Sequence, residues 1–303
     1  MSSPIIVGLA LREDDDAPLA LARIVSGFGA SPLVLVHAIR PDLPGPIPIA
    51  AYQAMVHREA AEKLDEVASR LPRDLQVSTR VTECSPSHAI QSLVLEYGAV
   101  AAVVGSTTRG AVGRVLAGDT AAGLLHDTHC PVVVAPRGYR ARVIGTVGVA
   151  YNASPESESA LTAAVGIAIE TGAAIRALTV LEPPHLVPLY ASPGFLTMPD
   201  YEQRRRDAAQ TTADRALGSI PHGVSATAEV REGGVVEALA ETSAQLDLLV
   251  CGSRGYGALH AVAGGSVARG LSHRAACPLV IVPRGVPLEA GPLWSAGAAA
   301  QVG

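Results

Sequence analysis

Short apolar runs alternate with longer polar-faced stretches along the whole chain. The runs are four to seven residues long and rich in Val, Ile, Leu and Ala, which is typical of buried strands. The stretches between them carry helix signals, such as Ser154-Pro155-Glu156, which offers a cap, a first-turn proline and an acidic residue. The pattern predicts an α/β fold, a parallel sheet covered by helices on both faces. The predicted strands are residues 5–9, 33–38, 76–81, 99–104, 132–135, 146–150, 175–181, 226–231, 246–251 and 279–282.

The second half of the chain repeats the first. A constant offset of 147 residues pairs Gly105-Ser106 with Gly252-Ser253 and Cys130-Pro131 with Cys277-Pro278. The beginnings match more loosely, and we align residues 7–10 with residues 147–150. A tandem duplication explains this self-similarity. We therefore expect one domain over residues 1–140, a second over 141–285 and a tail over 286–303, sizes at which each domain can bury its own core.

Composition and charge exclude several classes of protein. The chain is 49% hydrophobic and 17% charged, a composition typical of globular proteins. Its net charge of −5 is unsuited to nucleic-acid binding. The only basic run, residues 204–206, fits a solvated helix face. No apolar segment is long enough for a membrane span, and residues 1–10 lack an export signal, so we expect a cytoplasmic protein that does not contact membranes.

The four cysteines do not form a Cys-x-x-Cys pair. Three of them, Cys130, Cys251 and Cys277, lie in or beside apolar strands, where cysteine commonly serves as a small buried side chain. We expect reduced thiols and no structural disulfide.

A glycine-rich segment follows the strand predicted at residues 246–251. Gly252 and Gly255 open a loop whose backbone N–H groups could approach an anion, and Gly265-Ser266 stands where the next helix, residues 266–273, should begin. A helix start offers unpaired N–H groups and a positive dipole end to a phosphate. Glycines after a strand often mark only a tight turn, and Ser266 could serve only as a cap. The spacing Gly-x2-Gly-x9-Gly-Ser as a whole favours a phosphate site.

This spacing, together with the Cys-Pro endings at Cys130 and Cys277, resembles the universal stress protein family over nearly the whole chain, twice. The resemblance implies two tandem Rossmann-like domains, akin to adenine nucleotide alpha hydrolases, each a five-stranded parallel sheet with flanking helices. ATP would lie across the carboxyl ends of the strands. Tandem members resemble a dimer fused into one chain, so the strands after Pro131 and Pro278 are expected to pair in an intramolecular pseudo-dimer. A further homodimer is possible.

The resemblance also assigns nucleotide contacts in the second half. Asn152 departs from the family, which usually has Asp there, but its amide can both donate and accept hydrogen bonds. The phosphates would be held mostly by backbone groups, with Mg²⁺ as the companion ion. The adenosine contacts would fall on Ala150, Asn152 and Val180, and the phosphate contacts on Gly252, Ser253, Gly255, Gly265, Ser266 and Val267.

The two halves differ at these positions. The first half has Thr108 for Gly255 and Asp119 for Ser266, and the alignment of the beginnings sets Arg12 opposite Asn152. Asp119 is as good a helix cap as serine, but two like charges about 4 Å apart repel by on the order of 4 kcal/mol at an effective dielectric near 20. The acidic run at residues 13–16 adds to the repulsion. We expect ATP to bind well only in the second half, unless Thr120 or a bridging metal ion rescues the first.

Other chemistry is weakly indicated. The set His126, His129 and Cys130 is not repeated in the second half, where the aligned residues are His273, Ala276 and Cys277, so we expect no metal site. Neither a P-loop motif nor a Ser-His-acid set is present, and we assign no catalytic residue.

Three functions therefore stay open. The first is an ATP-binding stress or regulatory module with at most slow hydrolysis. The second is an enzyme that uses ATP, such as a slow ATPase or a phospho- or adenylyl transferase, which the lack of a visible base disfavours. The third is a nucleotide-free dimerisation module.

Overall fold

A computed structural model describes residues 3–12, 15–39, 49–107, 112–125, 128–183, 198–253 and 267–283. Within these ranges all ten predicted strands form, each with bounds within two residues of the prediction. The strands are β1 (Ile5–Gly8), β2 (Leu33–Ala38), β3 (Val77–Thr82), β4 (Ala101–Gly105), β5 (Val132–Ala135), β6 (Thr146–Ala150), β7 (Ala174–Leu181), β8 (Ala226–Glu232), β9 (Leu248–Gly252) and β10 (Leu279–Val282).

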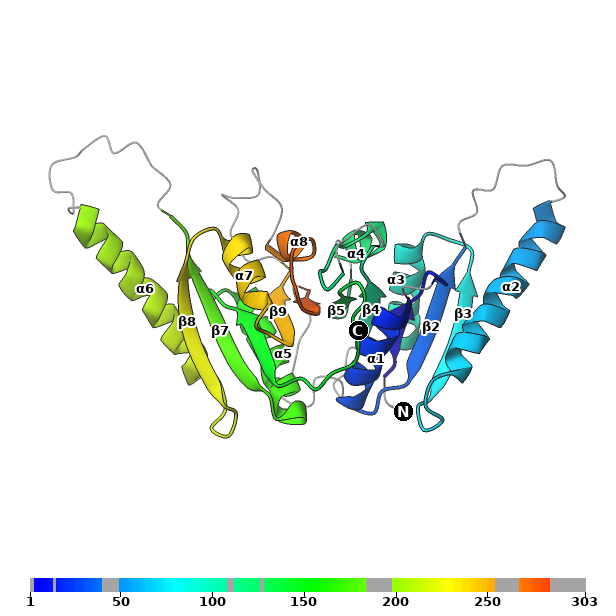
Figure 1. Cartoon of the computed structure of the whole chain (residues 1–303), viewed down its shortest axis with the longest axis horizontal. Helices are drawn as coiled ribbons and strands as arrows, with labels where there is room; N and C mark the ends of the chain where they lie inside the picture. The colour runs from blue at the N-terminus through cyan, green and yellow to red at the C-terminus, as the bar shows by residue number, and fades with distance from the viewer. Residues whose placement is uncertain are drawn as a thin grey trace, which may run out of the picture.

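The strands make one continuous sheet in the order β3-β2-β1-β4-β5-β10-β9-β6-β7-β8. Every pairing within a half is parallel, and the two halves meet where β5 and β10 pair antiparallel, with Val133 opposite Val280. Figure 1 shows the halves related by an approximate twofold axis, with β5 beside the centre and α2 and α6 at the outer ends. The prediction that the two last strands pair is confirmed.

Helices cover both faces of the sheet because successive side chains of a buried strand point to opposite sides. Ile5 and Val7 belong to one apolar core, and Ile6 belongs to the other. Both cores run through both halves, since residues of β5 and β10 contribute to each. One face packs against α1 (Asp16–Gly27), α2 (Ile49–Ser69), α5 (Pro155–Thr171) and α6 (Met198–Gly218), and the other against α3 (Pro86–Tyr97), α4 (Asp119–Leu124), α7 (Val235–Ser243) and α8 (Val267–Leu271).

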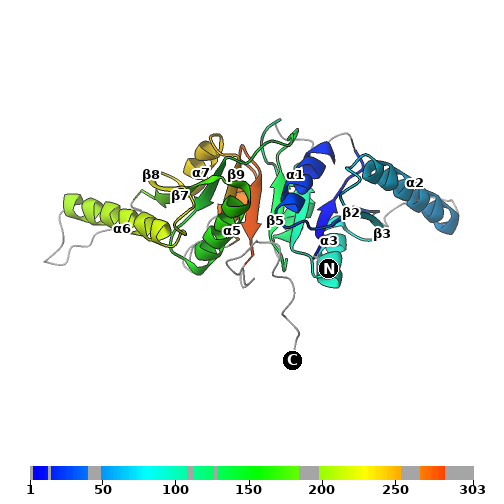
Figure 2. The same cartoon turned by 90° about the horizontal axis from the view of Figure 1, so that it is seen from below.

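Helix α5 begins as its sequence predicts. Ser154 is the N-cap residue, its Oγ accepts a hydrogen bond from the Ser157 backbone N at 3.2 Å, and Pro155 occupies the first turn. The molecule viewed from below shows α5 and α1 close to the central strands of their own halves (Figure 2).

The sheet register corrects the alignment of the two beginnings. Ile5 pairs with Ala101 in β4, and its counterpart Val147 pairs with Leu248 in β9. The equivalent positions are therefore 142 residues apart here, not 140, and Ala10 rather than Arg12 stands opposite Asn152. The prediction that Arg12 replaces Asn152 is wrong.

Backbone torsion supports the corrected register. Leu11 and Ala153, which the new offset pairs, both adopt positive φ values, 56° and 57°. Such values are uncommon for residues other than glycine, so the same strained turn follows the first strand of each half.

No helix in the described part of the chain is long and apolar enough to span a bilayer. The predicted tail at residues 286–303 lies outside the described residues.

All four cysteines are free, and the three predicted to be buried are at most 2% exposed. Burial raises the pKa of the Cys130, Cys251 and Cys277 thiols to about 12, so that each stays protonated and unreactive near neutral pH. Cys84 is half-buried.

At about pH 8, where a free thiol is partly ionised, we expect a chromogenic aromatic disulfide to modify only Cys84 in the native protein and all four thiols after denaturation. A Cys84→Ser variant that still reacts rapidly when native would contradict this prediction.

Candidate functional site

Equivalent cavities open at the carboxyl ends of the strands in each half. The cavity of the first half, here the N-terminal cavity, has a volume of about 890 Å³ and lies where β1, β2 and β4 end. Its counterpart, here the C-terminal slot, is only about 40 Å³ and lies where β6, β7 and β9 end. In parallel α/β sheets ligands bind at this edge, so both are candidate binding sites.

The C-terminal slot brings together most of the predicted contact residues that the structure describes. Ser253 directly follows Gly252, and its backbone N–H donates to the Val282 carbonyl at 2.8 Å, so that amide is not available to a phosphate. Gly255, Gly265 and Ser266 lie outside the described residues. The predicted residues that line the slot are Ala150, Asn152, Val180, Gly252 and Val267.

The Asn152 side chain is partly committed to its own turn. Its Oδ1 accepts hydrogen bonds from the Ser154 backbone N at 3.2 Å and from Ser154 Oγ at 2.6 Å. A carbonyl oxygen has two lone pairs, so its accepting capacity is used. The sequence-based expectation that the Asn152 amide would offer an acceptor to a ligand is therefore not met in this conformation.

Gly252 has a packing reason that the sequence did not reveal. A Cβ atom at this position would lie 2.7 Å from Glu156 Cβ, 2.8 Å from its carbonyl O and 2.9 Å from its carbonyl C. Helix α5 thus passes against β9 too closely for any side chain. The glycine is required by the fold whether or not a phosphate binds.

The N-terminal cavity contains two polar residues that sequence analysis did not single out as site residues. Asp15 accepts hydrogen bonds from the backbone N of Ala10 and of Arg12, both at 3.0 Å, and so ties down the loop after β1. Burial raises the pKa of the Asp15 carboxyl above its ordinary value, against the opposing effect of these two bonds. His37, at the end of β2, bonds the Leu9 carbonyl through Nδ1 at 2.9 Å. Because a carbonyl only accepts, Nδ1 carries a proton.

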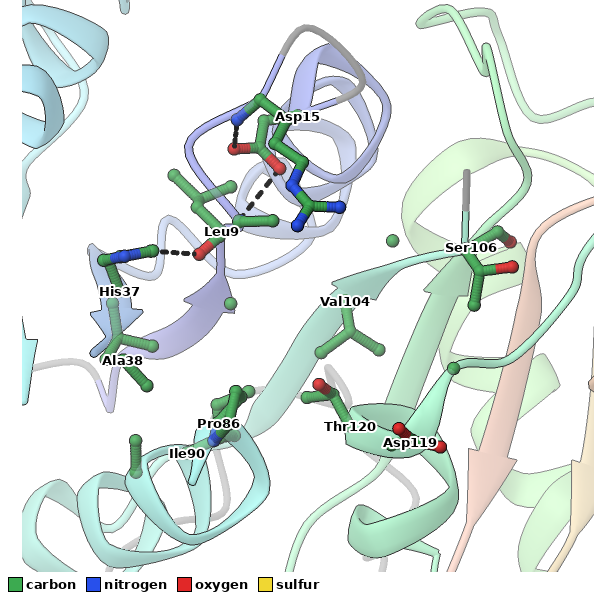
Figure 3. A pocket seen from close by; sticks show the side chains of 18 of the residues that line it. Leu9, Asp15, His37, Ala38, Pro86, Ile90, Val104, Ser106, Asp119 and Thr120 are labelled. Atoms are coloured by element: carbon green, nitrogen blue, oxygen red, sulfur yellow. Dashed lines mark hydrogen bonds between the residues drawn. The ribbon is translucent and has the colours of Figure 1, made fainter. Parts of the chain in front are cut away.

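Two sequence signals could have revealed this pair. His37 lies near the end of an otherwise apolar strand, and Asp15 lies in the short segment between β1 and α1. Figure 3 shows Asp15 and His37 on one side of the cavity and Asp119 and Thr120 on the other. Asp15 was expected to repel phosphates as part of an acidic run, but its carboxylate faces backbone N–H groups instead.

Asp119 does not act as the predicted cap. The N-cap residue of α4 is Gly118, and Asp119 is the first helical residue, with no side-chain capping bond. The exposed Asp119 side chain lines the N-terminal cavity together with Thr120. The carboxylate thus lines the cavity without a role in capping the helix.

The wall beside Asp119 is fixed by the other half of the molecule. The backbone N of Ala117 donates to the Ser272 carbonyl at 2.6 Å, and the backbone N of Val115 donates to the Ala275 carbonyl at 2.7 Å. Within its own half, the Leu116 N donates to Ser106 Oγ at 3.2 Å. The N-terminal cavity is therefore held in shape by both halves.

Side-chain size explains part of why one cavity is wide and the other narrow. At four equivalent lining positions the second half carries the larger residue, and these residues stand at the ends of the first and second strands of each half. The pairs are Gly8 and Ala150, Ala10 and Asn152, Val36 and Leu178, and Ala38 and Val180.

The metal-ligand set considered for His126, His129 and Cys130 cannot be assembled from the described residues, because His126 lies outside them. Across the described ranges, no group of three or more His, Cys, Asp or Glu side chains is arranged to hold a metal ion.

Comparison with known proteins identifies relatives over almost the full length. The sequence model of the Universal stress protein family matches residues 1–136 and again residues 144–283. A universal stress protein of Mycolicibacterium smegmatis is 27% identical over 292 residues, covering 92% of this chain and 96% of that protein. One from Mycobacterium tuberculosis strain H37Rv is 26% identical over 295 residues, covering 91% and 96%. The crystal structure of a universal stress protein from Archaeoglobus fulgidus superposes with a TM-score of 0.63 at 19% identity, covering 94% and 97%.

Proposed function

Because the chain belongs to the universal stress protein family, we propose that it is an adenine-nucleotide-binding regulatory protein whose C-terminal half holds ATP. One observation carries the proposal: Ala150, Asn152, Val180, Gly252 and Val267 converge on one slot although they are spread over more than a hundred residues of sequence. Gly255, Gly265 and Ser266 would complete the site from the segment between Ser253 and Val267. ATP would bind with Mg²⁺, and the protein would act in the cytoplasm.

The small volume of the C-terminal slot limits how a nucleotide can bind there. A drug-sized ligand fills a cavity of about 300–1,000 Å³, far more than the 40 Å³ between Asn152, Leu178 and Val180. The base can therefore contribute little by insertion between these side chains as they stand. We assign most of the affinity to the phosphates, through the glycine-rich segment and the start of α8. The site should consequently prefer ATP to AMP, and AMP to adenosine.

Regulation would arise from differential binding. A ligand shifts a conformational equilibrium only by the difference of its affinities for the two states. Helix α8 starts at Val267, beside the proposed phosphates, and the segment after its end accepts the hydrogen bonds from Val115 and Ala117 of the other half. Bound nucleotide would therefore act on the packing between the halves.

A matched pair of plugging variants tests the location of the site. Val180→Trp fills the C-terminal slot, and Ala38→Trp places the same bulk at the equivalent position of the N-terminal cavity. In calorimetric titrations we expect the native chain and Ala38→Trp to bind MgATP with similar affinity. We expect Val180→Trp to lose at least tenfold, with circular dichroism showing both variants folded.

Absence of MgATP binding to the native chain would refute the proposal. Loss of binding in Ala38→Trp alone would move the ATP site to the other half. Mass spectrometry of molecules released from the purified protein separates the alternatives: intact ATP supports a binding module, and a turned-over product supports an enzyme.

A further inference from the structure

The N-terminal cavity holds unpartnered polar groups among satisfied ones. Ser106 Oγ, for example, donates to the Ala135 carbonyl at 2.7 Å and accepts from the Leu116 backbone N. In contrast, the side chains of Arg12, Asp119 and Thr120 line the cavity without any partner among the described residues. Arg12 and Asp119 are exposed and Thr120 is partly exposed, so their polar atoms are open to a ligand in the cavity.

Thr107 also lines this cavity, and its hydroxyl is buried and, among the described residues, unpaired. Its Oγ1 has no accessible surface and no hydrogen-bond partner within the described structure, and the residue lines the same cavity. A buried hydroxyl without a partner costs roughly 1–3 kcal/mol. Because Oγ1 has no accessible surface, a ligand could pair with it only after the Thr107 side chain turned toward the cavity.

The cavity has the size and lining of a small-molecule site. Its volume of about 890 Å³ lies within the range of about 300–1,000 Å³ that such sites occupy. Val36, Ile90 and Val104 provide apolar surface between the polar sides, as Figure 3 shows for Ile90 and Val104. A largely apolar body of small-molecule size fits this part of the cavity.

The charges define which polar groups the ligand can carry. An ionised Asp119 carboxylate only accepts hydrogen bonds, so its complement is a hydroxyl or an amine. A phosphate at the same place would be repelled, by about 1 kcal/mol at 4 Å in water and about 4 kcal/mol near a protein surface. Arg12, which only donates, suits an acceptor at the other end of the ligand. The described lining carries two carboxylates, Asp15 and Asp119, against this single guanidinium.

We propose that the N-terminal cavity is a second ligand site, selective for a phosphate-free molecule of nucleoside size whose hydroxyl or amine donors face Asp119 and Thr120. The two halves then bind different but chemically related molecules. The roomy cavity accepts the uncharged body and rejects polyphosphate, whereas the narrow slot depends on the phosphates. The inference rests on the proposed function only for the choice of adenosine as the probe.

The test uses the full chain with the C-terminal slot closed by Val180→Trp. In this background we expect adenosine to bind with one equivalent per chain and MgATP to bind at least tenfold more weakly. Adding Ala10→Trp, which fills the cavity from an exposed position, should abolish adenosine binding. Adding Asp119→Asn should weaken adenosine severalfold, whereas Asp74→Asn, on an exposed loop of the same half, should have no effect.

The reverse change gives a gain of binding that a misfolded variant could not imitate. In the same background, Asp119→Ser should raise MgATP affinity by about fivefold to a thousandfold, the range set by the two repulsion energies. Failure of adenosine to bind, or MgATP binding as tightly as adenosine before that change, would overturn the inference. Failure of adenosine to bind leaves MgATP binding by the native chain untouched, whereas absence of MgATP binding to the native chain leaves adenosine binding in the Val180→Trp background untouched, so the two proposals fail by different results.

Discussion

Replacing Ser266 with aspartate is expected to lower the affinity of the native chain for MgATP by about a hundredfold or more. The change gives the second half the residue that the first half has at Asp119. A carboxylate about 4 Å from a phosphate oxygen is repelled by on the order of 4 kcal/mol at an effective dielectric near 20, and each 1.4 kcal/mol is a factor of ten. Aspartate is as favourable as serine at a helix start, so folding should be unaffected.

Calorimetric titration with MgATP measures this effect directly. The control is Ser219→Asp, the same substitution at an exposed position on the opposite edge of the sheet, where the chain leaves α6 and approaches the start of β8. We expect the control to bind like the native chain. Unchanged affinity in Ser266→Asp would show that the phosphates do not lie at the start of α8, and the assignment of the phosphate site would be wrong.

The strands were predictable because their signal is local. Buried parallel strands are continuous apolar runs, and the runs ending at Ala135 and Val282 are so strongly β-branched that their bounds match the structure. The pairing of β5 with β10 is a tertiary feature that no local pattern contains. It was anticipated only through the resemblance to a family whose tandem members resemble fused dimers.

The alignment of the two beginnings failed for a physical reason. Apolar strands resemble one another in any register. Residue type alone therefore does not distinguish the alignment of residues 7–10 with residues 147–150 from one shifted by two residues. Hydrogen bonding removes the ambiguity, since Val7 pairs with Val103 exactly as far along its strand as Val149 does with Val250. The error mattered, because it set a charged residue, Arg12, opposite Asn152 where the structure has Ala10.

The candidate site was only partly accessible to sequence reasoning. The resemblance to the universal stress protein family indicated that Ala150, Asn152 and Val180 meet around the C-terminal slot, and the glycine motif indicated Gly252. Parallel strands bring these residues together because their carboxyl ends lie at one edge. Cavity volume depends on differences of one or two carbon atoms, such as Ala38 against Val180, which no motif records. The inward turn of Asp15 toward the backbone N–H groups of Ala10 and Arg12 likewise depends on a loop conformation that sequence patterns do not encode.

Gly252→Ala is expected to destabilise the protein by about 2–3 kcal/mol, the upper part of the range for overpacking a tight site. The added methyl group would meet the backbone of Glu156, with its carbonyl O at 2.8 Å and carbonyl C at 2.9 Å. Backbone atoms of α5 cannot rotate aside as the end of a flexible side chain can. The helix must shift away from β9, which disturbs the packing of its own buried residues, such as Ala160.

Gly105→Ala is the matched control, because Gly105 is the equivalent position at the end of β4. There a Cβ atom would lie 3.4 Å from Pro18 Cδ and Cγ, an ordinary van der Waals contact. We expect a change of at most about 0.5 kcal/mol, since alanine also restricts the unfolded chain. Urea unfolding of both variants measures the difference. If Gly252→Ala lost MgATP binding but kept native stability, the glycine would serve the ligand rather than the packing of α5 on β9, and the structural explanation for its presence would fail.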